Sequence, residues 1–145
     1  MPAQSNKQIV TRFFEECLDQ ADVELVDELF SADCIIHRPD PAESLNGLDA
    51  IRNIVIGAKE RYREITTTMH LMVEEDDIVA CRISHAVVYE NTWKTRLGTH
   101  DVAGKSCDWF ANVFFRVRDG KIVEEWVVRD ELGMHLKLGL IDSGK

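Results

Sequence analysis

Apolar residues in the first part of the chain recur every three or four positions, which is the spacing of amphipathic helices. Ser5 and Gln8 form a capping box that predicts where the first helix begins. Asp22 precedes a second, shorter helix, and Asn46 or Gly47 begins a third. The apolar positions of the three predicted helices are Ile9, Val10, Phe13, Phe14, Cys17 and Leu18, then Leu25, Val26, Leu29 and Phe30, then Leu48, Ile51, Ile54, Val55, Ala58 and Tyr62.

From residue 64 onward the apolar period changes to two, which is typical of strands. The predicted strands are residues 65–73, 78–89, 105–117 and 122–130, with a short earlier strand at residues 34–38. Residues 90–103 indicate a loop or an irregular hairpin. This order predicts a single α+β domain over residues 1–145, with helices on one face of a mostly antiparallel sheet. Because a long sheet twists, we expect it to curl around the helices into a cone-shaped barrel with an open, apolar interior.

The last two strands are joined by Asp119-Gly120, which predicts a type I′ turn. In a regular strand after this turn, Trp126 and Asp130 share one face, and Glu125 and Arg129 take the other. A carboxylate beside an indole loses hydration, which raises its pKa and suits it to proton transfer near neutral pH. The spacing alone favours a second interpretation, in which Asp130 is the N-cap of a C-terminal helix.

Charge and composition exclude several classes of function. The net charge of −9 leaves no basic stripe for nucleic acid or for an anionic membrane surface. The chain has no apolar run of membrane-spanning length, no apolar signal core at its start and no glycine-rich nucleotide motif, so we expect a cytoplasmic protein. The four cysteines, Cys17, Cys34, Cys81 and Cys107, lack metal-ligand or C-x-x-C spacing and are expected to be buried free thiols.

The C-terminal hairpin resembles the signature of the SnoaL-like polyketide cyclases, a family of the nuclear-transport-factor-two-like (cystatin-like) superfamily. The matching residues are Phe115-Arg116, Asp119-Gly120-Lys121-Ile122-Val123-Glu124, Trp126 and Asp130. The resemblance implies a cone-shaped α+β barrel, a homodimer, and catalysis without metal or cofactor. It also implies that Asp130 is the acid/base of an intramolecular aldol ring closure on a small hydrophobic carbonyl substrate. On this hypothesis, Asp130→Asn keeps the fold and abolishes turnover.

Other side chains are candidates for the same pocket. His37 is the second catalytic candidate, because the resemblance places its strand at the pocket mouth; a surface or structural role is the alternative. Trp126, Asn112, Phe110, Asp108 and Phe114 are candidates for substrate binding. For the last four, which share one face of their strand, the alternative is the solvent-facing side of the sheet. Phe14 and His85 complete the substrate-binding set, each with core packing as its alternative. His70, His100 and His135 lack the spacing of metal ligands.

Two other functions fit the same fold. One is an epoxide hydrolase of the limonene type, which needs two carboxylates bridged by an arginine. Arg129 and Asp130 are adjacent and point to opposite faces of the strand, which does not fit that arrangement. The other is a non-catalytic ligand-binding or dimerisation module, with valines and Trp109 on the outward face of the sheet as its interface. An open cone would favour an enzyme, and a cone filled by side chains would favour the module.

Overall fold

The computed structural model describes residues 4–39, 44–142 and 144. The first helical region runs through α1 (Asn6–Arg12) and a π-helical segment, η1 (Phe13–Leu18). A 3₁₀ turn, η2 (Val23–Leu25), and one turn of α-helix, α2 (Val26–Leu29), follow. The long helix α3 (Gly47–Arg61) follows the short edge strand β2 (Ser44–Asn46) in the sequence. The predicted capping box at Ser5 and Gln8 and the predicted start of the third helix are confirmed.

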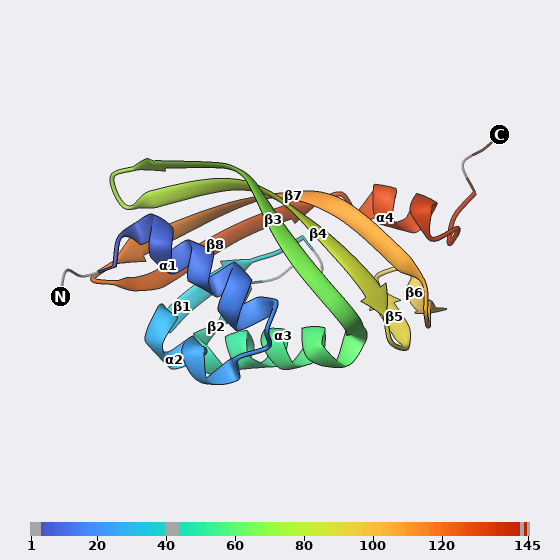
Figure 1. Ribbon diagram of the computed structural model, residues 1–145, viewed down its shortest axis with the longest axis horizontal. Helices are drawn as coiled ribbons and strands as arrows, with labels where there is room; N and C mark the ends of the chain where they lie inside the picture. The colour runs from blue at the N-terminus through green and yellow to red at the C-terminus, as the bar shows by residue number, and fades with distance from the viewer. Residues whose placement is uncertain (1–3, 40–43, 143, 145) are drawn as a thin grey trace.

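One curved sheet of six strands carries the fold, in the order β2-β1-β8-β7-β4-β3. Neighbouring strands are antiparallel except β1 and β8, which are parallel. The main strands are β1 (Phe30–His37), β3 (Tyr62–Glu75), β4 (Ile78–Tyr89), β7 (Ser106–Arg118) and β8 (Lys121–Arg129). In Figure 1 the sheet arches over α1, α2 and α3, while α4 (Glu131–Lys137) lies at the far end of the arch. The predicted α+β architecture with a curved sheet around N-terminal helices is confirmed.

Residues 90–103, which the sequence leaves as a loop or irregular hairpin, form a hairpin of β5 (Thr92–Thr95) and β6 (Gly98–Asp101). Its Trp93 is buried, and the Trp93 ring centroid lies 4.8 Å from that of His135 in α4. The hairpin therefore closes one end of the barrel together with the C-terminal helix.

The core has two parts. The larger one fills the space between the helices and the sheet and is centred on the rings of Phe13, Phe14, Phe30 and Phe115. The smaller one lies toward α4 and the β5–β6 hairpin and consists of Ala58, Tyr62, Val87, Tyr89, Trp93, Val102, Cys107, Trp109, Met134 and Leu138. All four cysteines are buried and free, as predicted. The outward position predicted for Trp109 is wrong, because this indole is buried in the smaller core.

A bulge in the C-terminal hairpin decides which side chains face inward. The turn forms as predicted, with positive φ at both Asp119 and Gly120. The pairing of β7 with β8 then shifts register at Arg116 and Val117, so that the alternation along β8 reverses just after Ile122. Glu125 is consequently buried on the same face as Ile122, whereas a regular strand would place these two residues on opposite faces of the sheet.

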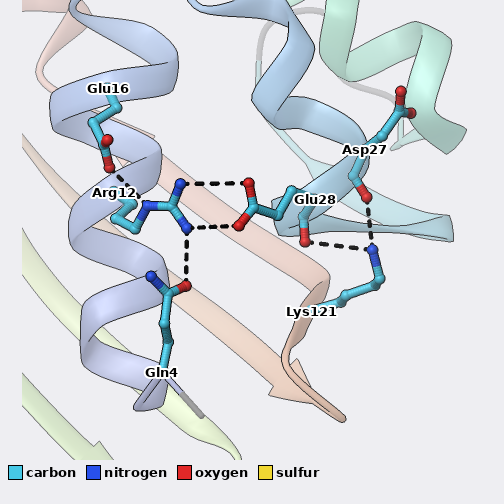
Figure 2. Close-up of polar contacts among 6 residues, drawn as sticks. All are labelled: Gln4, Arg12, Glu16, Asp27, Glu28 and Lys121. Carbon is cyan, nitrogen blue, oxygen red and sulfur yellow. Dashed lines mark hydrogen bonds and ion pairs between the residues drawn. The ribbon is translucent and has the colours of Figure 1, made fainter. Parts of the chain in front are cut away.

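Polar contacts on the outer surface tie the first helices together (Figure 2). The guanidinium of Arg12 donates to Glu16 on the same helical region and to Glu28 in α2, at 2.7 and 2.9 Å. The Arg12 cation beside Glu28 lowers the pKa of that carboxyl below its usual value. Lys121 Nζ donates to the backbone oxygens of Asp27 and Glu28, which joins α2 to the start of β8. These contacts fix the helices against the sheet edge without approaching the interior.

Candidate functional site

A cavity of about 100 Å³ lies inside the barrel where the two parts of the core meet. Its apolar side chains come from η1, α3, β3, β7 and β8. Its polar side chains come from the residue after β1, the end of α3, β4, the end of β8 and the start of α4. The lining residues are Leu18, Arg38, Pro39, Ile54, Ala58, Arg61, Tyr62, Ile65, His85, Trp109, Ala111, Val127, Arg129 and Glu131. A mostly apolar wall with a few charged groups is typical of a small-molecule site.

His85 is the titratable imidazole of this cavity, and it is held by its cross-strand neighbour. Thr67 of β3 is the register partner of His85 of β4, and its Oγ1 lies 2.8 Å from His85 Nδ1. The same hydroxyl donates to Asp19 Oδ1 at 2.7 Å, and the Thr67 backbone N–H donates to Asp19 Oδ2 at 2.8 Å. Three segments far apart in the sequence thus form one hydrogen-bonded chain, Asp19–Thr67–His85.

The hydrogen bonds of Thr67 assign the tautomer of His85. A hydroxyl has one proton, and that of Thr67 is directed to the Asp19 carboxylate. Nδ1 of a neutral His85 must therefore carry the proton that it shares with Oγ1, which leaves the lone pair on Nε2. Among the described residues, this bond to Thr67 is the ring's only hydrogen bond. The imidazole borders the cavity with its basic nitrogen unpaired.

The surroundings shift the pKa values at the two ends of this hydrogen-bonded chain in opposite directions, and each shift favours the neutral form of its group. Burial, reinforced by the positive charges of Arg129 and Arg38, lowers the pKa of His85 to about 4. Burial also raises the pKa of Asp19 above its usual value, although the two hydrogen bonds from Thr67 oppose this. At neutral pH His85 is therefore uncharged, and Asp19 accepts a proton more readily than an exposed aspartate does.

Three arginines, Arg38, Arg61 and Arg129, give the cavity its positive charge. Arg38 follows β1 and lies 3.9 Å from the buried carboxylate of Glu125. Burial raises the pKa of Glu125, and the Arg38 cation opposes this shift. Arg129 lies 3.5 Å from Glu131, and its guanidinium is 5.8 Å from the centroid of Trp93. Glu131 and Glu125 thus contact different arginines, whereas the epoxide-hydrolase alternative needs one arginine between two carboxylates.

Asp130 lies outside the lining of the cavity. Its side chain is exposed and accepts a hydrogen bond from the backbone N–H of Gly133 at 2.9 Å, so it is the N-cap of α4. The predicted capping role is confirmed. After the bulge in the hairpin, Asp130 and Trp126 lie on the outer side of the sheet. The two sequence neighbours of Asp130, Arg129 and Glu131, line the cavity. The catalytic role predicted for Asp130 stays a prediction.

His37 also lies on the outer face. Its Nε2 is 2.7 Å from Glu124 Oε2, and its Nδ1 is 3.0 Å from Ser44 Oγ. The imidazole stacks on the indole of Trp126, its register partner on β8, with ring centroids 5.5 Å apart. Because strand residues alternate, the next residue along, Arg38, is the one that borders the cavity. A catalytic role of His37 stays a prediction, and its contacts are those of a surface polar cluster.

The polar and aromatic residues of β7 that were expected to face the cavity lie on the outer face instead. Asp108, Phe110, Asn112 and Phe114 are exposed, and they alternate with the buried Cys107, Trp109, Ala111, Val113 and Phe115. The face of β7 that is apolar throughout therefore points inward, and the expectation that the other face lines the cavity is wrong. Asn112 Oδ1 accepts a hydrogen bond from Arg82, and the Arg82 guanidinium covers the ring of Phe110.

Of the remaining candidates, His85 lines the cavity, and Phe14 packs in the core behind it with the two ring centroids 6.2 Å apart. The sequence missed Asp19, Thr67 and Arg38. The weak signal for Thr67 was its alternation with Ile65 on the inward face of β3. No cluster of three or more potential metal ligands occurs among the residues that the structure describes. Within the same residues, no helix has the length and hydropathy needed to cross a bilayer.

Comparison with known proteins places this geometry in context. Residues 8–138 match the family model described as SnoaL-like polyketide cyclase. IdmH from Streptomyces antibioticus superposes with a TM-score of 0.79 at 22% identity, covering 94% of this chain and 99% of IdmH. TsrD from Streptomyces laurentii gives 0.81 at 19% identity, covering 97% and 100%. A SnoaL-like polyketide cyclase from Agrobacterium tumefaciens gives 0.76 at 16% identity, covering 94% and 99%. No curated protein matches the sequence.

Proposed function

Because the chain belongs to the SnoaL-like polyketide cyclase family, we propose that it is an acid–base catalyst of the cyclase type that acts on a small carbonyl compound in the barrel cavity. Family membership supports a cyclase-like function and a small, largely apolar substrate. The observation that carries the proposal is the position of His85, which borders the cavity with Nδ1 held by Thr67 and with Nε2 unpaired within the described part of the chain.

The hydrogen-bonded chain gives the proton a route. Nε2 of His85 removes a proton from the carbon alpha to the substrate carbonyl, and the electron pair of that C–H bond moves into the enolate. As Nε2 gains this proton, Nδ1–H passes to Thr67 Oγ1, and the Thr67 hydroxyl proton passes to Asp19 Oδ1. His85 stays neutral throughout, which suits an imidazole whose pKa is about 4, and Asp19 becomes a carboxylic acid.

The ring closure then returns the proton. The enolate carbon attacks a second carbonyl of the same substrate, which forms a C–C bond and places the negative charge on an alkoxide. The guanidinium groups of Arg38 and Arg129, which line the cavity, stabilise the charge on the enolate and alkoxide oxygens. The proton travels back from Asp19 through Thr67 and His85 to the alkoxide, so that the protein ends in its starting state. No cofactor enters this sequence of steps.

The family resemblance assigns the acid–base role to Asp130, and one experiment separates the two assignments. Deuterium exchange of the methyl protons of acetophenone in D₂O, followed by ¹H NMR, reports proton abstraction alpha to a carbonyl without knowledge of the natural substrate. We expect His85→Gln to reduce the exchange rate by about 100-fold or more, since general bases contribute about 10²–10⁴-fold. Asp130→Asn is the matched variant, and loss of exchange in Asp130→Asn with full exchange in His85→Gln would return the role to Asp130.

A dimerisation role is favoured by a separate observation on the outer face of the sheet. Five apolar side chains are exposed there on β7, β8 and, across β4, on β3: Leu71, Val73, Phe110, Phe114 and Val128. Exposed apolar side chains that gather on one face are typical of a protein–protein interface. We propose that this face joins two copies of the chain, as the family resemblance implies. Light scattering should give a dimer mass for the wild type and a monomer mass for Phe114→Arg. Leu97→Arg, at an exposed apolar site in the β5–β6 turn, is the control and should leave the mass unchanged.

A further inference from the structure

Arg38 is incompletely paired at the wall of the cavity. Its Nε atom is buried and has no hydrogen-bond partner among the described residues, although 29% of the side chain as a whole is exposed. The ion pair with Glu125 is long, at 3.9 Å, and it involves the terminal Nη2 rather than Nε. A buried donor without a partner is destabilising, and a charged one more so. The geometry therefore leaves a place for an acceptor beside Arg38.

The charges around the cavity define which acceptor fits. Among the described lining residues, Arg38, Arg61 and Arg129 are cationic and Glu131 alone is anionic. This excess of positive charge occurs in a chain whose net charge is −9. Arg61 contacts the ring of Tyr62 from 5.5 Å, and Arg129 covers Trp93, so both guanidinium groups are also held by aromatic side chains. Arginines held in this way favour a planar anion that accepts two parallel hydrogen bonds.

We propose that the cavity binds the carboxylate of its ligand through Arg38, with Arg129 and Arg61 as the neighbouring cations, and that the substrate is accordingly a small keto acid. The proposal rests on the proposed function in one respect, because the same cavity must also hold the reacting carbonyl. The apolar wall formed by Ile54, Ile65 and Val127 accommodates the carbon skeleton of the ligand. The carboxylate supplies the acceptor that the buried Nε of Arg38 lacks.

Such a ligand also affects His85. The positive charges of Arg129 and Arg38 contribute to the low pKa of this imidazole, after burial. A carboxylate between the two guanidinium groups offsets those charges, so that protonation of His85 becomes easier when an anionic ligand is bound. The arginines would then act twice: they select an anionic substrate, and binding of that substrate makes Nε2 a better base.

The test compares two ligands of nearly equal shape, benzoate and benzamide, by isothermal titration calorimetry at neutral pH and low salt. We expect benzoate to bind the wild-type protein at least about tenfold more tightly than benzamide, as is typical of a charge-assisted pair. In Arg38→Met, which keeps the apolar stem of the side chain, the two affinities should become nearly equal. Arg63→Met is the matched control, because Arg63 is an exposed arginine that pairs with Glu90; it should keep the preference.

Equal affinities in the wild-type protein, or an unchanged preference in a folded Arg38→Met, would overturn the proposal. If circular dichroism shows that Arg38→Met does not fold, Arg129→Met replaces it, and the wild-type ratio already decides whether the cavity prefers a carboxylate. Neither titration depends on turnover. A benzoate preference that requires Arg38, combined with acetophenone exchange that is unaffected by His85→Gln, would support the carboxylate site and refute the proposed catalysis.

Discussion

The hydroxyl of Thr67 lies 2.8 Å from His85 Nδ1, and its single proton is directed away from the imidazole to Asp19. This relationship fixes which nitrogen of His85 is basic. It also connects the cavity to a carboxyl group whose pKa burial has raised. The imidazole, the hydroxyl and the carboxyl together form a hydrogen-bonded chain with one end at the cavity and the other within the wall of the barrel.

Replacing Thr67 tests the tautomer directly. In Thr67→Val a methyl group replaces the hydroxyl and cannot accept a hydrogen bond from Nδ1, so the Nδ1–H tautomer of His85 loses its only described partner. We therefore expect the ¹⁵N NMR shifts of the ring to move toward those of the other tautomer. Loss of the hydroxyl should also reduce the free energy of unfolding by about 1–2 kcal/mol. Thr67→Ser keeps the hydroxyl and should keep the wild-type tautomer. A wild-type ring with its proton on Nε2 would contradict the assignment.

The low pKa of His85 predicts a dependence of stability on pH. The unfolded chain binds a proton at His85 below its ordinary pKa of 6.5, whereas the folded protein binds it only near pH 4. Between these values the unfolded state holds more protons, so the free energy of unfolding falls as the pH falls, by up to about 3 kcal/mol from this residue. Above pH 6.5 the contribution is complete and constant.

The matched comparison is between wild type and His85→Gln in urea denaturation at several pH values. Asp19 titrates in the opposite sense, because its raised pKa makes the folded state hold the extra proton; the difference between the two proteins removes that effect. We expect the difference in unfolding free energy to change between pH 6.5 and 4. A constant difference across this interval would show that His85 has an ordinary pKa.

The N-cap of α4 makes a separate prediction about Asp130. Asp130→Ala removes the acceptor for the Gly133 N–H and should reduce the free energy of unfolding by about 1 kcal/mol. Asp130→Asn, which can still cap, should be close to the wild type in stability. Thermal unfolding of the two variants measures this contrast. If both variants were as stable as the wild type, the cap would contribute nothing, and a functional reason for this carboxylate would gain weight.

The periodic parts of the chain predicted the fold well, because each depends on neighbouring residues. The capping box at Ser5, the positive-φ turn at Asp119-Gly120 and the alternation along residues 78–89 all reappear in the structure. The inward face of the last strand could not be predicted in the same way. Which of its residues point inward depends on a register shift against Arg116 and Val117, and no local sequence pattern predicts that shift.

The site was harder to predict than the fold for a related reason. Asp19, Thr67 and His85 come from three elements and meet only when the helices pack inside the sheet. His85 stood out as an inward-facing histidine on a long strand, but its partners carried no spacing signal. Arg38 is the last residue of a predicted strand and precedes a proline, and nothing in the sequence distinguishes it from His37, which points to the opposite face.

The most direct measurement of the central claim is the deuterium exchange of acetophenone by the wild-type protein, His85→Gln and Asp130→Asn, with circular dichroism to confirm that each variant folds. If His85 is the base of the cavity, the wild type and Asp130→Asn exchange the methyl protons at similar rates, and His85→Gln loses about 100-fold or more of that rate. Exchange that survives in His85→Gln and disappears in Asp130→Asn would contradict the account and place the chemistry at the end of the last strand.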